Sequence, residues 1–135
     1  MRKAGLLIFF LILAVSVFAE DAGRKVFKAV IDERGVQKAD IIGGEYFFDP
    51  NYIIVKANVP VELTIKKTTG YVPHNIIIKG LDTLTEINAN IDKEPKVLKF
   101  TPRKIGKYPF YCDKKLLFFK SHQERGMEGI IEVIE

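Results

Sequence analysis

The residues with the clearest chemical potential lie near the C-terminus, in the segment "YPFYCDKKLLFFKSHQERGMEG" of residues 108–129. This segment contains the only cysteine of the chain, Cys112, followed by one of the two histidines, His122. It also contains Met127, the only methionine besides the initiator. A thiolate, an imidazole and a thioether are ligands for soft and borderline transition metals. The sequence therefore raises the question of whether these three residues, with the other histidine, His74, form a metal site.

Taken singly, each of these residues has an ordinary structural interpretation. A free cysteine is often a small buried hydrophobe, and methionine fills irregular gaps in cores. A single histidine is more often structural than a ligand. As a set, however, two imidazoles, one thiolate and one thioether are the donors of a trigonal His₂Cys copper site with a weak axial methionine. The set predicts one copper ion, cycling between Cu(I) and Cu(II), held by His74, Cys112, His122 and Met127.

The first residues, "MRKAGLLIFFLILAVSVFA", predict export. Arg2 and Lys3 precede an apolar run over residues 6–15, and Val17 and Ala19 form a small-residue cleavage pattern. We expect a signal peptide over residues 1–19, a single domain over residues 20–135, and a periplasmic or extracellular location. The apolar run is short for a membrane span, so cleavage is favoured, although a retained anchor stays open. No stable membrane insertion is expected after cleavage.

Export makes the unpaired thiol informative. Exported proteins usually pair their cysteines, so a single one indicates an intermolecular disulfide, a reactive thiol or a metal ligand. A metal-bound sulfur is held deprotonated, and the bound form is shielded from oxidation and exchange. Metal binding thus explains why an exported chain keeps one cysteine.

Net charge argues against nucleic acid as a partner. The formal net charge of +4 becomes +2 when Arg2 and Lys3 leave with the signal peptide. The remaining lysines are scattered among strands and turns and form no basic stripe with interleaved aromatic residues, the pattern typical of nucleic-acid binders. No nucleic-acid partner is expected.

The elements that must position the ligands are strands. Short alternating or β-branched runs separated by turn residues predict about eight strands and an all-β fold, a Greek-key β-sandwich or barrel. The segment over residues 80–95 is the least regular and predicts a helical turn or a long connection. Gly43 and Gly44 mark a bulge or a point of close approach. The expected strands cover residues 24–32, 37–48, 52–57, 59–67, 74–80, 96–102, 107–112 and 128–135.

These strands place the four ligands at one end of the fold. Cys112 ends a predicted strand, Met127 precedes the last strand, and His122 lies in the loop between them. His74 begins a different strand after the loop "TTGYVP" and can face the same end.

From about residue 40 to residue 135 the sequence resembles the cupredoxins, the plastocyanin- and azurin-like proteins. The resemblance rests on "VPHNIII", on "FTPRKIGKYPFYC" and on "HQERGMEGIIEV", which has the family's His-x₄-Met spacing and glycine entry into the last strand. It implies that His74 and His122 are equatorial nitrogen ligands, Cys112 the equatorial thiolate and Met127 the axial ligand. It also implies that Asn75 ties the two ligand loops together by hydrogen bonding.

One segment departs from the family. Nine residues, "DKKLLFFKS", separate Cys112 from His122, where two to four are common, and the residue after the cysteine is Asp113. This insertion implies a distorted site, in which Asp113 or Glu124 is an alternative to Met127. Its apolar part, Leu116, Leu117, Phe118 and Phe119, has two interpretations: a satellite cluster that caps the sandwich, or an exposed patch that docks a redox partner. In the second case Lys114, Lys115 and Lys120 favour an acidic partner.

The expected function is therefore one-electron transfer between redox protein partners, without catalysis, since protein ligands fill the site and leave no open position for a substrate. No catalytic residues are expected. The alternatives are an exported copper carrier or resistance protein and a metal-free, cupredoxin-like accessory module.

Overall fold

The computed structural model describes residues 23–68, 70–81 and 86–135. All regular structure in these residues is β, so the predicted all-β class is confirmed, and no helix in this part could cross a membrane. The predicted signal peptide lies outside the described residues and stays a prediction. The strands are β1 (Val26–Lys28), β2 (Val30–Ile31), β3 (Gln37–Gly43), β4 (Phe48–Asp49), β5 (Tyr52–Lys56), β6 (Val61–Lys67), β7 (His74–Ile78), β8 (Ile87–Ile91), β9 (Lys96–Phe100), β10 (Gly106–Tyr111) and β11 (Glu128–Ile134).

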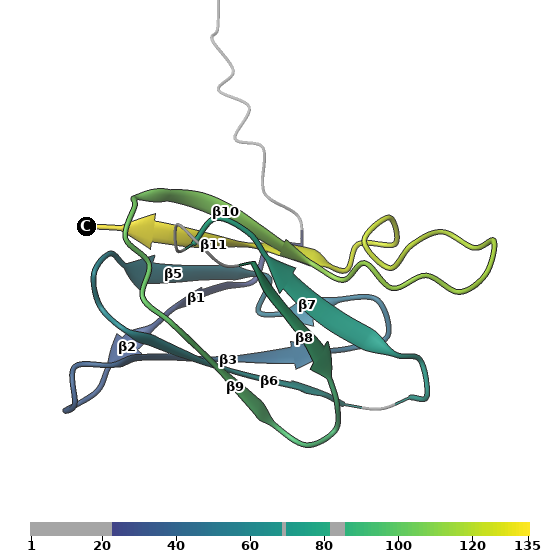
Figure 1. Ribbon diagram of the computed structural model, residues 1–135, viewed down its shortest axis with the longest axis horizontal. Helices are drawn as coiled ribbons and strands as arrows, with labels where there is room; N and C mark the ends of the chain where they lie inside the picture. Colours follow the sequence, from purple (N-terminus) through teal and green to yellow (C-terminus); the bar gives the residue numbers. More distant parts are fainter. Residues whose placement is uncertain (1–22, 69, 82–85) are drawn as a thin grey trace, which may run out of the picture.

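The strands form two sheets that face each other as the layers of a sandwich (Figure 1). One sheet has the order β1-β5-β11-β10-β7-β8, and the other has the order β2-β3-β6-β9, with β4 paired to β3. Both sheets are mixed: β5 is parallel to β1 and to β11, and β3 is parallel to β6.

The core lies between the sheets and follows the alternation of the strands. In β6, Val61, Leu63 and Ile65 are buried while the two residues between them are partly exposed, as the sequence predicts. In β3 the same alternation buries Ala39 and Ile41. Fully burying such an aliphatic side chain stabilises the fold by about 1.5–3 kcal/mol. Strand β7 differs, because all five of its residues are buried.

Three details differ from the prediction. The second expected strand, residues 37–48, ends at Gly43, and the chain turns back so that β4 pairs with β3. The first expected strand is divided into β1 and β2, which pair with strands of different sheets, β5 and β3. The irregular segment contains a strand, β8, which pairs with β7 along five positions from His74↔Ile91 to Ile78↔Ile87. The helical-turn and connection interpretations of residues 87–91 were therefore wrong. Asparagine is depleted in strands, so the two asparagines of "INANI" argued against a strand in the sequence. The strand forms because β8 pairs with β7.

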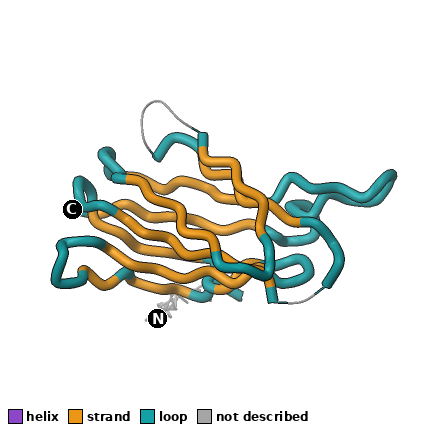
Figure 2. Tube along the Cα trace, turned by 60° about the horizontal axis from the view of Figure 1, so that its bottom comes forward, coloured by secondary structure: helices purple, strands orange, loops and turns teal. Residues whose placement is uncertain are grey.

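Strand direction brings the ends of three strands to one pole of the sandwich, here called the site pole. Strand β10 is antiparallel to both β7 and β11, and its last residue, Tyr111, pairs with Glu128 at the start of β11 and with Ile77 near the end of β7. The chain beyond Tyr111 therefore runs toward the start of β7, where the Asn75 N–H donates to the Cys112 Sγ. The C-terminus lies at the opposite pole (Figure 1). Residues 112–127, which join β10 to β11, include a loop that extends well beyond the sandwich in both views (Figures 1 and 2).

Replacing Gly129 by alanine should destabilise the fold by about 2 kcal/mol, the usual cost of overpacking. Gly129 pairs with Phe110 across β10 and β11. A Cβ at this glycine would overlap the Phe110 ring and lie 2.5 Å from the backbone oxygen of Asn51. Chemical denaturation measures the loss. Val97→Ala, on an exposed strand position, is the control and should change stability by less than about 0.5 kcal/mol. Equal stability of the two variants would contradict this account of the β10–β11 pairing.

Candidate metal centre

Cys112 is fixed where β10 and β11 begin to diverge. It follows directly after β10, and its N–H donates to the backbone oxygen of Met127 across 3.1 Å. Its side chain is fully buried, and the backbone N–H of Asn75 donates to its Sγ at 3.4 Å. The sulfur is thus held by the strand pairing on one side and by the start of β7 on the other.

The two histidines approach the sulfur from different elements. His74 is the first residue of β7, and only 3% of its surface is exposed. His122 is equally buried but comes from the connecting segment, where its N–H donates to the backbone oxygen of Lys114 at 2.9 Å. The backbone oxygen of His122 accepts the N–H of Met127 at 2.9 Å. This turn over residues 122–127 is the reason why the nine-residue insertion does not displace His122 from the site.

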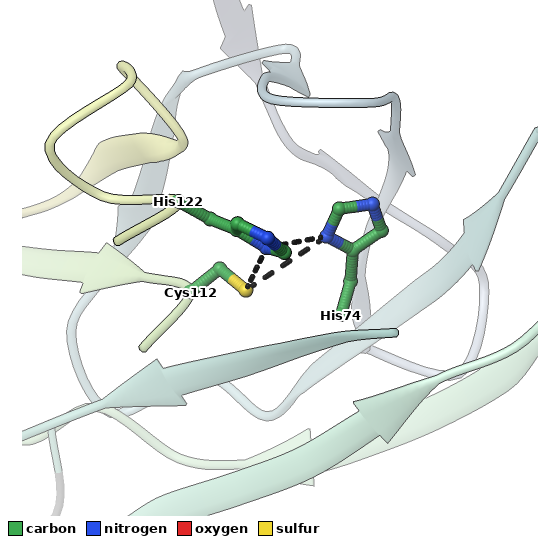
Figure 3. A group of neighbouring side chains, drawn as sticks. All are labelled: His74, Cys112 and His122. Carbon is green, nitrogen blue, oxygen red and sulfur yellow. Dashed lines mark hydrogen bonds between the residues drawn. The ribbon is translucent and has the colours of Figure 1, made fainter. Parts of the chain in front are cut away.

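The three donor atoms converge (Figure 3). The Nδ1 atoms of His74 and His122 are 3.1 Å apart, and the Cys112 Sγ lies 3.9 Å from the first and 3.5 Å from the second. All three residues are buried, and their ligand atoms lie within 4.8 Å of one another. The structure therefore brings together three of the four residues that the sequence predicts as ligands in one compact cluster.

This spacing fits a single metal ion. With metal–nitrogen and metal–sulfur bonds of about 2.0 and 2.3 Å, the values typical of zinc sites, a trigonal centre separates its donors by about 3.5–3.8 Å. The observed separations of 3.1, 3.5 and 3.9 Å lie within about 0.4 Å of this range, so a metal ion fits without a large movement of the strands. Two imidazoles and one thiolate are the equatorial donors of a His₂Cys copper centre.

The fourth predicted ligand, Met127, is fully buried. Its backbone forms hydrogen bonds with the backbones of both Cys112 and His122. Its methyl carbon lies 3.6 Å from the position that a Cβ on Gly43 would occupy, which is an ordinary van der Waals contact. Of the two glycines predicted as a bulge or a close approach, Gly44 is the close approach, because a Cβ there would overlap the Phe47 ring. The carboxylate alternatives have other partners: Asp113 accepts from Asn75, and Glu124 accepts from the Ser121 N–H. The cluster found among the described residues contains no carboxylate.

Burial sets the protonation of the imidazoles. It lowers the pKa of His74 from 6.5 to about 4, and the charges of His122 and Lys67 act in the same direction. It also lowers the pKa of His122, assisted by Arg125. At neutral pH both rings are therefore neutral, and each has a lone pair available for a metal.

Burial has the opposite effect on the thiol. It raises the pKa of Cys112, and the N–H groups of Asn75 and Lys114 offset part of the increase. The metal-free site therefore holds a protonated thiol, and binding of a cation must release that proton.

Asn75 joins the loop of Cys112 to β7 and β8. Its side-chain oxygen accepts the Asp113 N–H at 3.1 Å, and its amide nitrogen donates to the Asp113 carboxylate at 2.8 Å and to the Asn88 oxygen at 3.1 Å. The resemblance predicted this tie for Asn75. It did not predict Asp113 as the reciprocal partner, because the sequence shows only that an aspartate replaces a small hydroxyl residue.

The apolar part of the insertion is exposed, which excludes the satellite-cluster interpretation. The exposed fractions of Leu116, Leu117, Phe118 and Phe119 range from 57% to 100%. Two hollows lie against His122 at the base of this loop. One, of about 180 Å³, is lined by Tyr46, Leu116, Phe119, Lys120 and Arg125. The other, of about 260 Å³, is lined by Tyr71, Val72, Pro73, Lys114, Lys115 and Leu116. No sequence pattern indicated Tyr46 or Tyr71, because their place at the site depends on how separate loops meet.

Comparisons with known proteins agree with this geometry. The metal-binding domain of the Cu(I)-exporting P-type ATPase CopA of Streptococcus pneumoniae D39, solved with Cu(I), has a TM-score of 0.61 and 24% identity, over 82% of this chain and 97% of that domain. Dithionite-reduced auracyanin of Roseiflexus castenholzii has a TM-score of 0.58 and 21% identity, over 73% and 97% of the two chains. Auracyanin A of Chloroflexus aurantiacus, a "blue" copper protein, has a TM-score of 0.56 and 22% identity, over 74% and 100%. At these identities the likenesses show a shared fold.

The fold and the His-Cys-His cluster define a mononuclear copper protein built on a β-sandwich. A family model for the cupredoxin-like domain matches residues 5–127, and the chain belongs to this family. The cofactor is one copper ion. A comparison with curated protein sequences found no match.

Replacing Asn75 by alanine should weaken copper binding about 10- to 100-fold, the usual effect of losing a group that orients a ligand. The change removes all three side-chain hydrogen bonds of Asn75 and leaves the Asp113 N–H without its acceptor. Competition with a chelator measures the affinity. Asn88→Ala, which removes one of these bonds, is the matched control and should have a smaller effect. Equal effects of the two variants would contradict the role given to the Asn75–Asp113 pair.

The copper-free protein should lose stability as the pH falls from 6.5 to about 4. In this range the unfolded chain protonates His74 while the folded chain does not. The unfolded state therefore binds more protons, and the free energy of unfolding decreases by about 3 kcal/mol. Denaturant titrations at several pH values measure the slope, and His74→Asn should flatten it. An unchanged slope in this variant would show that His74 titrates normally in the fold.

Proposed function

We propose that this protein is a one-electron carrier whose copper is bound by His74, Cys112 and His122, with Met127 as the axial ligand. The observation that carries the proposal is the convergence of two Nδ1 atoms and one Sγ within 3.1–3.9 Å inside a buried pocket. Bound copper supplies a Cu(I)/Cu(II) couple, for which thiolate and thioether favour the reduced state and imidazole suits both.

The chain's own contribution is to hold the donors still. Backbone hydrogen bonds fix Cys112 to Met127, and Met127 to His122, while β7 fixes His74. Ligands that do not move between oxidation states keep the reorganisation during electron transfer small. With every donor supplied by the protein, no coordination position is assigned to a substrate, so we propose no enzymatic activity.

Electrons would enter and leave through the edge of the site at His122. The two hollows against this residue put it at the base of an apolar and basic surface. Leu116 lines both hollows and Phe119 lines one of them, so these two residues are proposed as contacts for a redox partner. Lys114, Lys115 and Lys120 favour an acidic partner, mainly by increasing its rate of association. The predicted leader supports an exported, periplasmic or extracellular location for this exchange.

A second candidate function is copper delivery. The likeness to the metal-binding domain of a Cu(I)-exporting ATPase, solved with Cu(I), favours it. A delivery protein should bind Cu(I) in preference to Cu(II), exchange it readily with competing chelators and transfer electrons slowly. A metal-free accessory module should show no copper signal at all.

Replacing Cys112 by serine should abolish the intense thiolate-to-Cu(II) absorption of the copper-loaded protein. Met127→Leu should retain the absorption and raise the reduction potential, because the axial thioether is lost while the thiolate stays. Optical and EPR spectra with voltammetry measure both effects. Full colour in the serine variant would contradict the ligand assignment.

Voltammetry of the parent protein distinguishes electron transfer from copper delivery. An electron carrier gives a reversible one-electron wave and retains copper in both oxidation states. Loss of the metal on oxidation, together with rapid Cu(I) exchange, would favour delivery over electron transfer.

A further inference from the structure

The loop between Cys112 and His122 ends in a tight apolar turn. The Phe119 N–H donates to the backbone oxygen of Leu116 at 3.0 Å, so Leu117 and Phe118 are the two central residues of the turn. Leu117 has a φ of 48°, in the left-handed region, which reverses the chain at this point. The turn lies at the end of the loop that extends beyond the sandwich (Figures 1 and 2).

The two central residues differ from the residues on either side of them. Leu116 and Phe119 line the hollows against His122. Leu117 and Phe118 line neither hollow, and their exposed fractions are 75% and 100%. The arrangement divides the loop into a base that adjoins the copper site and a tip that faces away from the protein.

The charged residues within the loop segment 114–120 have one sign. Lys114 and Lys115 precede the apolar residues, Lys120 follows them, and the sequence from 114 to 120 contains no acidic residue. The fields of Lys115 and Lys120 reach Glu124 and help to lower its pKa. Asp113 and Glu124, the nearest acidic residues in the sequence, accept hydrogen bonds from Asn75 and Ser121.

We propose that Leu117 and Phe118 insert into the surface of an anionic lipid bilayer, with the three lysines, which line the hollows at the base of the loop, at the level of the headgroups. Exposed leucine and phenylalanine side chains beside lysines are the combination with which peripheral proteins bind such interfaces. Each lysine near an anionic leaflet contributes about as much as a fivefold change in affinity. Long lysine side chains can also extend their charge to the headgroups while their stems lie along apolar surface.

The shape of the tip favours lipid over protein as its partner. A stable protein interface buries roughly 1,200–2,000 Å² in total, far more than two adjacent side chains on a narrow turn can offer. A bilayer needs no complementary surface and accepts single protruding side chains. The broader base, with its two hollows, is the surface suited to a protein.

The beginning of the described chain lies on the same side of the molecule. Asn51 donates to the Gly23 oxygen, and Gly23 and Arg24 line a hollow together with Gly126, one residue before Met127. A leader that remained uncleaved would therefore hold this pole, with the loop, toward the membrane. Membrane binding would keep His122 close to the bilayer, where integral redox complexes reside, but it does not itself require copper.

The test uses the chain from residue 20 onward, which retains the eleven strands and both sheets found among the described residues, and with them the core between the sheets. The protein contains no tryptophan, so Phe118→Trp introduces one reporter at the tip. With vesicles of phosphatidylcholine and phosphatidylglycerol in equal parts, its fluorescence should shift to the blue and be quenched by brominated lipid. Ile105→Trp, at an exposed position before β10 and so at the opposite pole, is the control and should show neither change.

Affinity gives the second measurement. In vesicle co-sedimentation, the double variant Leu117→Asp, Phe118→Asp should lose binding at least tenfold, whereas Ile105→Asp should not. Lys115→Glu should lose about fivefold or more, compared with Lys104→Glu at the opposite pole. All four variants should retain the copper absorption of the parent, so a failure of the lipid proposal is distinguishable from a failure of the copper assignment.

Three results with the anionic vesicles would overturn the proposal: no binding of the parent protein, equal loss of binding in the Ile105→Asp control, or an unquenched tryptophan at position 118. In each case the loop tip would be left as a contact for a protein partner. Equal binding to pure phosphatidylcholine would also overturn it, because the lysines would then contribute nothing.

Discussion

The metal site depends on one sulfur and two nitrogen atoms that converge at the site pole of the sandwich. Cys112 comes from the end of β10, His74 from the start of β7, and His122 from the segment leading to β11. Because β10 lies between β7 and β11 and is antiparallel to both, these positions are neighbours in space. A shift of one residue in either pairing would turn the side chains to the opposite face and separate the donors. The register of the sheet is therefore a condition of metal binding.

Burial gives this arrangement its chemical character. The pocket keeps both imidazoles neutral and the metal-free thiol protonated. Copper bound by Cys112 would replace the proton on the sulfur and supply the positive charge that the buried thiolate requires. Burial makes an imidazolium or a free thiolate costly in the pocket. The same burial shields the metal-bound sulfur from solvent. The Asn75–Asp113 pair holds the cysteine loop against β7.

The sequence predicted much of this site and of the fold. His74, Cys112 and His122 were identified from donor chemistry and chain order, and the alternation of β6 predicted its buried face. The sequence failed where tertiary contacts override local preference. Strand β8 is rich in asparagine and owes its conformation to pairing with β7. The exposure of Leu117 and Phe118 could not be predicted either, because an apolar run fits a buried cluster as well as a surface. The reciprocal bond of Asp113 required the position of Asn75, which only the folded chain provides.

X-ray absorption at the copper edge of the loaded protein tests the central claim most directly, since it reports the atoms bound to the metal. The account predicts one sulfur at about 2.3 Å and two nitrogens at about 2.0 Å in the first shell, close to the bond lengths of other His and Cys sites. A first shell of nitrogen and oxygen alone, with no short sulfur distance, would contradict it.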